Sequence, residues 1–203
     1  MRVFKYIIFY LFLFTTACFG QGIGFRGGIE FANREQLNNG LGIGTYFTFN
    51  SFSEKFNLFV SYDYFTKRNE IFSKDLLMNY KKHKFSIAPL YIMPLKEKFD
   101  FKVGPMLSYN SVFATHQGVV SRWLLNYYSK SIGLETIVNL QIKNVLKFPL
   151  NIDFFVTPAY LINISRKIDE NPDPSGTIPE YGNNLINITF QMGLTYHFNR
   201  QKE

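Results

Sequence analysis

Residues 185–198 read LINITFQMGLTYHF, and apolar and polar side chains alternate along the whole stretch. One face of an extended chain would carry large apolar groups: Ile186, Ile188, Phe190, Met192, Leu194, Tyr196 and Phe198. The other face would carry small or polar groups: Asn187, Thr189, Gln191, Gly193, Thr195 and His197. A period of two predicts a β-strand. The predicted strand is longer than most strands of soluble sandwiches, and its apolar face is bulky at every position, so we expect that face to contact lipid.

The end of this stretch also resembles the C-terminal signal by which bacterial outer-membrane barrels are recognised for insertion. In that signal a polar residue is followed by Gly two positions on and by aromatics five and seven positions on, here Gln191, Gly193, Tyr196 and Phe198. The resemblance implies that the chain is inserted as a membrane barrel.

The N-terminus has the order of a secretory signal peptide. Arg2 and Lys5 precede an apolar run over residues 6–14, and small or polar residues follow to position 21. The run is shorter than the roughly 20 residues of a membrane-spanning helix. We therefore predict a cleaved signal peptide over residues 1–20, with export through the Sec pathway.

Cys18, the single cysteine of the chain, lies within this predicted leader. A lipoprotein with an acylated Cys18 is a second reading, disfavoured because Thr15 stands where an aliphatic residue is usual. Without the leader, the chain has no thiol for a disulfide or a thiolate metal site. It also loses two of 22 basic residues, which leaves 20 against 15 acidic residues and a mild net charge of +5.

The composition argues against a helical membrane protein. Aromatic residues make up 18 % of the chain, yet the mean hydropathy is −0.07. No stretch beyond the leader is long and apolar enough for a spanning helix. Many aromatics distributed over alternating segments are typical of a membrane barrel, in which half of each strand faces the lumen.

Seven further segments alternate in the same way: residues 23–31, 41–49, 56–64, 85–95, 99–109, 132–142 and 150–160. The links between the eight segments are alternately short and long. The short links are residues 50–55, 96–98 and 143–148, and the long ones are 32–40, 65–84, 110–130 and 165–184. This alternation is typical of transmembrane barrels. A soluble lipocalin-like barrel would instead have a polar exterior. The sequence predicts an all-β fold, an eight-stranded antiparallel up-and-down transmembrane β-barrel over residues 21–198, with a periplasmic tail over 199–203.

Three prolines, Pro89, Pro94 and Pro105, make the fourth and fifth segments the poorest strands. The hairpin over residues 86–109, SIAPLYIMPLKEKFDFKVGPMLSY, nevertheless resembles one found in the PorT-like family of small outer-membrane barrels, with Pro89 in one strand and Gly104-Pro105 in the next. The resemblance implies an outer-membrane barrel and permits a part in secretion or envelope assembly. Most members of that family have no defined biochemical role.

The inward faces of the predicted strands gather charged and titratable residues: Arg26, Glu30, Asp63, Asp100, Lys102, Glu135, Asp153 and His197. An eight-stranded barrel is just wide enough for side chains to fill, so we expect these groups to pair and close the lumen. A narrow polar conduit is the alternative. Four glycines on the same faces are expected to make room for Tyr46 and its neighbours: Gly24, Gly28, Gly42 and Gly44.

Some small membrane barrels are lipid-modifying enzymes that need a Ser, a His and an acid in mutual reach. The candidates are His116, Ser121 and Glu135, without the His-x-Ser pattern of a deacylase. We therefore expect no enzymatic activity, and we assign no catalytic residue, no cofactor and no metal site. His83 and His116 would form a metal site only by chance convergence.

Two of the predicted long loops are unusual. The second is basic, with Lys67, Arg68, Lys74, Lys81, Lys82 and Lys84. It is either a solvated loop or a docking site for lipopolysaccharide phosphates or an acidic partner. The third is apolar, with Val119, Val120, Trp123, Leu124, Leu125, Tyr127 and Tyr128. Either the flanking strands extend beyond the membrane, or this loop caps the barrel or binds another protein. Alternatively, its aromatic residues form part of the interfacial girdle.

Together these features predict a barrel of the bacterial outer membrane that has no through-pore and acts as a structural or interaction component of the envelope. The expected partners are outer-membrane lipid and lipopolysaccharide, and other envelope proteins contacted through the long loops. We expect no nucleic-acid partner.

Overall fold

The structure is a computed structural model, which describes residues 21–33, 40–50, 55–73, 76–118, 124–145, 148–170 and 184–198. The predicted signal peptide over residues 1–20 and the tail over 199–203 lie outside the described residues. So do Ser121, Trp123 and most of the fourth predicted loop.

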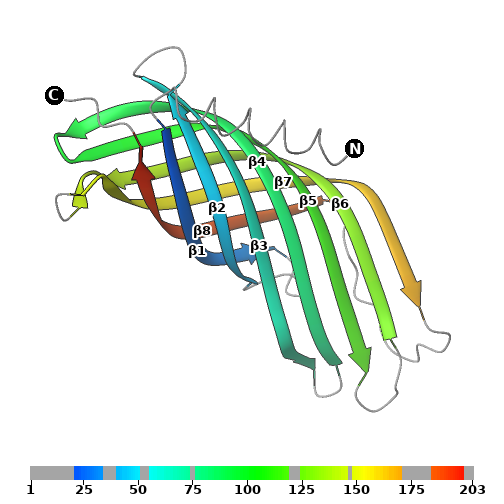
Figure 1. Cartoon of the computed structure of the whole chain (residues 1–203). Coiled ribbons are helices and arrows are strands. Elements are labelled where there is room, and N and C mark those ends of the chain that lie inside the picture. The colour runs from blue at the N-terminus through cyan, green and yellow to red at the C-terminus, as the bar shows by residue number, and fades with distance from the viewer. Residues whose placement is uncertain are drawn as a thin grey trace, which may run out of the picture.

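Eight strands form one closed barrel in which every neighbouring pair is antiparallel. The strands are β1 Gln21–Ala32, β2 Gly40–Asn50, β3 Phe56–Ser73, β4 Leu76–Lys96, β5 Phe99–Gly118, β6 Leu124–Ile142, β7 Leu150–Glu170 and β8 Asn184–His197. Each strand pairs with the next along the chain, and β8 closes the barrel on β1, with Ile23 opposite Tyr196 (Figure 1). The predicted eight-stranded up-and-down barrel is confirmed.

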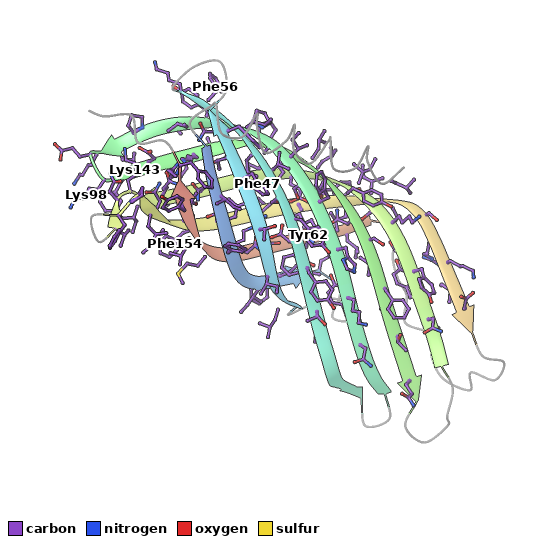
Figure 2. The ribbon with its side chains drawn as sticks, viewed as in Figure 1. Phe47, Phe56, Tyr62, Lys98, Lys143 and Phe154 are labelled. Atoms are coloured by element: carbon purple, nitrogen blue, oxygen red, sulfur yellow. The ribbon has the colours of Figure 1, made fainter. Side chains whose placement is uncertain are left out.

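The alternation of the sequence becomes an apolar exterior and a largely polar interior. The exposed large side chains of β8 are those predicted to face lipid, from Ile186 to Tyr196, and Phe198 directly after the strand is exposed as well. Figure 2 shows Phe154, another of these exposed rings, on the outer wall. On β5 the outward residues are apolar from Phe99 to Tyr109, eleven residues, which is about the length that a tilted strand needs to cross hydrocarbon. In the described ranges, no helix has the length and hydropathy of a membrane span.

Strands β3 to β7 continue well beyond the ends predicted for them, whereas β1, β2 and β8 end within one or two residues of their predicted ends and are shorter (Figure 1). The predicted loops over residues 65–84 and 110–130 are therefore mostly strand, and β7 extends to Glu170 into the fourth predicted loop. This outcome agrees with the alternative in which strands five and six extend. The prediction ended too early because past Tyr64 and Tyr109 the outward side chains become polar, which breaks the apolar-outward pattern but not the strand.

The opposite end of the barrel, here called the short-turn end, carries tight connections. The β4–β5 turn is Glu97–Lys98, and Asn144 in the β6–β7 connection has a φ of 52°. Asn tolerates this left-handed conformation better than most residues. The Asn144 backbone N–H donates to the side-chain oxygen of Asn151 at 3.0 Å, which fixes the connection to β7.

Candidate functional site

The barrel interior is filled by buried side chains, and its centre is a layer of ion pairs. Lys82 Nζ lies 2.5 Å from Glu30 Oε2, and Lys84 Nζ lies 2.5 Å from Glu135 Oε2. Arg26 binds Asp63 through two bonds, Nε to Oδ1 at 2.8 Å and Nη2 to Oδ2 at 2.6 Å. All six side chains are buried. The predicted pairing of the lumen charges is therefore present for Arg26, Glu30, Asp63 and Glu135.

The prediction from the sequence is wrong for two lysines of this layer. Lys82 and Lys84 were predicted to lie in a basic external loop, but both point into the lumen from β4. Their neighbours Lys81 and His83 point outward. Residues 81–84 are all basic, so inward and outward positions of the strand have the same polarity. The period of two therefore cannot be recognised in this part of the sequence.

Hydrogen bonds complete the layer. Glu30 also accepts from the Tyr80 hydroxyl at 3.0 Å and from the Asn187 amide at 3.0 Å. Glu135 accepts a short bond from the Ser108 hydroxyl, and Asp63 accepts from Gln191 Nε2 at 3.0 Å. Buried carboxylates need this compensation, since an unpaired charge in a dry interior is costly.

An aromatic layer lies between the ion pairs and the short-turn end. Tyr46, Phe59 and Phe155 pack with ring centroids 5.2 to 5.8 Å apart, together with Ala88, Leu90, Met106 and Ile137. The Arg26 guanidinium carbon lies 5.0 Å from the Phe155 ring centroid and 5.1 Å from that of Phe59. The rings thus stabilise Arg26 through their faces while Asp63 binds its edge.

Gly24 makes this layer possible. A Cβ at that position would lie 2.2 Å from Cζ of Tyr46, so the ring occupies the space of the missing side chain. The expectation of room for Tyr46 is confirmed at Gly24. Gly42 and Gly44 instead make room for Phe65 and Asp63. A Cβ at Gly28, the fourth position, would meet the backbone of β8.

Polar and apolar layers close the two ends of the lumen. Near the short-turn end, Asp153 accepts hydrogen bonds from Tyr46, Asn139 and Gln141, and Lys102 donates to Gln141 at 2.8 Å. At the other end lies an apolar cluster: Phe65, Tyr80, Val112, Ala114, Leu125, Tyr127, Ala159, Leu161 and Leu185. Leu125 and Tyr127, predicted in an exposed loop, are buried here, whereas Tyr128 faces outward.

The His116, Ser121 and Glu135 combination is not supported as a site. Glu135 stands opposite Met106 in β5, and His116 lies ten residues further along that strand. At about 3.4 Å per residue this is a separation of roughly 34 Å. Glu135 is occupied by Lys84 and Ser108, while Ser121 and the His116 side chain lie outside the described residues.

The other two histidines, His83 and His197, lie in different surroundings. His83 shares a 2.7 Å hydrogen bond with the Tyr62 hydroxyl on the outer face. His197 lies at the lumen rim as predicted, but its Nε2 is buried without a hydrogen-bond partner among the described residues. Within those residues, no group of three His, Cys, Asp or Glu side chains could hold a metal ion.

The outer face changes character abruptly where β4 to β7 pass beyond the apolar residues. The last fully apolar row across these strands is Phe85, Tyr109, Ile132 and Ile162. The next row is polar, with His83, Ser111, Lys130 and Ser165, and the one after it contains Lys81, Phe113, Tyr128 and Lys167. The exposed apolar residues between this last apolar row and the short-turn end are here called the apolar band.

The short-turn end has a polar rim. Lys143 donates its backbone N–H to the Lys98 carbonyl at 2.8 Å, and its Nζ lies 3.1 Å from Asp100 Oδ1. Figure 2 shows Lys98 and Lys143 together at this end. They line a shallow groove of about 530 Å³ with Lys96 and Glu97. The predicted inward position of Asp100 is confirmed, and its partner Lys143 comes from the neighbouring connection.

No family model matches this chain, and no curated protein matches it by sequence. Among solved structures, it is similar to neisserial surface protein A, with 14 % identity over 88 % of this chain and 97 % of that chain and a TM-score of 0.60. It is also similar to Ail, the attachment invasion locus protein of Yersinia pestis, with 13 % identity, the same coverage and a TM-score of 0.53.

A major outer membrane protein from Thermus thermophilus gives a similar result, with 11 % identity over 88 % of this chain and 99 % of that chain and a TM-score of 0.55. At these identities the similarity concerns the fold. The chain has the barrel architecture of these outer-membrane proteins.

Proposed function

We propose that this protein is an integral barrel of the bacterial outer membrane that has no through-pore and serves as a structural or interaction component of the envelope. The fold and the apolar band support the membrane placement, because a strand of eleven residues with apolar outward side chains, such as Phe99 to Tyr109, matches the hydrocarbon thickness. In this placement the short-turn end faces the periplasm and the extended strands face outward.

The filled lumen is the observation that carries this proposal. Ion pairs, the aromatic layer around Tyr46 and the apolar cluster around Tyr127 follow one another along the barrel axis. A conducting pore needs a continuous polar path in which ions bind weakly enough to leave. Here Arg26 and Asp63 bind each other, and rings cover the guanidinium. These contacts support a barrel without a through-pore over the conduit alternative.

The surfaces left for a role are therefore external. Strands β3 to β7 project past the apolar band, and the rim near Lys98 and Lys143 faces the opposite compartment. An interaction role at either surface, with a part in secretion or envelope assembly, is the function that the resemblance to PorT-like barrels suggests.

Planar-bilayer recording tests the closed lumen. The wild-type protein is expected to give no stable conductance steps. A variant with Tyr46→Ala, Phe59→Ala and Phe155→Ala removes one of the three closing layers, and it should stay silent too, because the ion pairs and the apolar cluster around Tyr127 remain. Steady conductance by the wild-type protein would argue for a conduit.

Extraction of the native protein from outer membranes in mild detergent tests the interaction role. The barrel should migrate faster before boiling than after it, and a stoichiometric partner should co-purify and be identified by mass spectrometry. A heat-modifiable monomer without any partner would contradict the interaction role. Absence of both membrane association and heat modifiability would overturn the barrel placement itself.

A further inference from the structure

We infer that the outer face of β4 to β7, just beyond the apolar band, binds the phosphorylated sugar headgroup of a lipopolysaccharide-type lipid in the surrounding leaflet. The residues that carry this site are Lys81, Lys130 and Lys167, here called the basic collar. The inference rests on the outer-membrane placement proposed above and gives that placement a specific lipid partner.

Strand register brings the basic collar together from distant parts of the chain. Lys81 stands opposite Phe113, which stands opposite Tyr128, which in turn stands opposite Lys167. Lys130 lies in the adjacent row, beside Ser111 and Ser165. All three lysines are exposed on the outer face. Lys81 and Lys167 thus lie on either side of the aromatic pair Phe113 and Tyr128.

The spacing suits a phosphorylated disaccharide. Three strand intervals of about 4.8 Å separate Lys81 from Lys167, roughly 14 Å across the sheet. Between them, the Phe113 and Tyr128 rings pack with centroids 4.9 Å apart. Such rings offer an apolar surface to the C–H faces of sugars, while ammonium groups at both sides bind phosphate oxygens.

Two grooves flank Phe113 on this face. One, of about 270 Å³, is lined by Phe113, Tyr128, Lys130 and Lys167 together with Ser111 and Ser165. The other, of about 410 Å³, is lined by Lys81, Thr66 and Thr115 among others. Each groove therefore combines a lysine with hydroxyl groups, which can donate hydrogen bonds to a phosphate.

The charges of the basic collar are available to a ligand. In the part of the chain that the structure describes, Lys81 and Lys130 have no carboxylate partner, in contrast to buried Lys82 and Lys84. Lys167 Nζ lies 2.9 Å from Asp169 Oδ1, but both side chains are largely exposed, and such a pair is weak in water. The local balance is therefore positive.

The basic collar lies next to the apolar band, which favours a membrane lipid over a free anion as its ligand. Directly below Lys130 lie Ile132 and Leu134, against which acyl chains would pack. Lys130 lies one row beyond the apolar band, and Lys81 and Lys167 lie two rows beyond it, about 7 and 13 Å along the strand. These distances place the three lysines at the level of the lipid headgroups. The described residues of β1, β2 and β8 contain no lysine, so the site is confined to one side of the barrel.

The test compares lipid retention by the purified full-length barrel in detergent, measured by native mass spectrometry. The probes are diphosphorylated lipid A, the same lipid A after phosphatase treatment, and inorganic phosphate as competitor. The test variant is Lys81→Ala, Lys130→Ala and Lys167→Ala. The matched control is Lys55→Ala, Lys96→Ala and Lys98→Ala, which removes three exposed lysines at the opposite end.

The test variant is expected to bind diphosphorylated lipid A about 100-fold more weakly, if each lysine contributes the roughly fivefold of a basic residue near an anionic surface. The control variant should bind like the wild-type protein, and dephosphorylated lipid A should bind weakly to all. Equal retention by the test variant would overturn the inference, as would efficient competition by millimolar inorganic phosphate, which would indicate a free-anion site.

A separate readout distinguishes this failure from failure of the proposed function. If all variants show the heat-dependent mobility shift of a membrane barrel but lipid retention does not depend on the basic collar, the inference is wrong and the membrane placement remains. If the wild-type protein shows neither the shift nor membrane association, both are wrong.

Discussion

Pro89 of β4 and Pro105 of β5 stand directly opposite each other on the outer wall. The register runs from Ile87 opposite Leu107 to Tyr91 opposite Val103, and the three pairs between them are missing from the ladder. Proline has no N–H to donate. In a hydrogen-bonded pair, the two facing residues normally donate to each other, and two prolines can form neither bond. The ladder is then interrupted at this pair and at the pair on each side of it. Both prolines retain ordinary pairing on their other sides, with Leu58 and Thr136.

Restoring the two donors should strengthen the barrel. Pro89→Val with Pro105→Val adds two backbone hydrogen bonds of about 1 kcal/mol each. The greater freedom of the unfolded chain offsets about half of that gain, so the free energy of unfolding should rise by about 1 kcal/mol. Urea titration in lipid vesicles measures it, with Pro94→Val at the strand end as control. A double variant no more stable than that control would mean that the strands are held apart for another reason.

Adding one methyl group at Gly24 should be costly. The new Cβ would overlap the buried ring of Tyr46, whose hydroxyl donates to Asp153 at 2.8 Å. Overpacking of this kind costs about 1 to 3 kcal/mol. Gly27→Ala on the same strand is the matched control, because its Cβ would meet nothing nearer than the Gly42 carbonyl at 3.6 Å. Equal urea midpoints for the two variants would refute the tight fit at Gly24.

Two adjacent lysines of β4 should respond in different ways to the same substitution. Lys82→Met leaves Glu30 charged and buried with only Tyr80 and Asn187 as donors, and we expect a loss of about 3 kcal/mol in unfolding free energy. Lys81→Met removes an exposed cation and should change stability by less than about 0.5 kcal/mol. Adding Glu30→Gln to Lys82→Met should recover part of the loss. If both single variants lose equal stability, Lys82 is not the partner of Glu30.

His116 and Glu135 should have no joint part in lipid chemistry. Since His116 and Glu135 lie about 34 Å apart along the sheet, they cannot act on one substrate bond. Deletion of the gene, or His116→Ala, is therefore expected to leave the acylation pattern of lipopolysaccharide unchanged in mass spectra of extracted lipid A. A missing or additional acyl chain in the deletion strain, restored by the wild-type protein, would show an activity that this geometry does not explain.

The membrane-spanning part of the fold could be predicted from the sequence because one physical constraint governs it. Outward residues such as Phe190 and Met192 contact lipid at every second position, so the period of two is visible without any tertiary information. The same constraint identified Arg26, Asp63 and Glu135 as lumen residues.

The extended strands could not be predicted in this way. Beyond Tyr109 the outer face also carries polar groups, so outward Ser111 and inward Ser129 have the same polarity and alternation disappears. The interior partners were equally hidden. Lys84 meets Glu135 only because β4 and β6 both border β5, and a contact between residues 51 positions apart depends on register that a single sequence does not reveal.

The pairing of β1 with β8 also constrains the order of folding. Gly22 meets His197, so the contacts that close the wall join the two extremes of the barrel segment. Contacts of such high sequence separation form late, after most of the loop-closure entropy has been lost. Until residues 184–198 arrive, both β1 and β7 expose a free strand edge, which is a template for aggregation. Closure of the wall thus waits for the last strand of the chain.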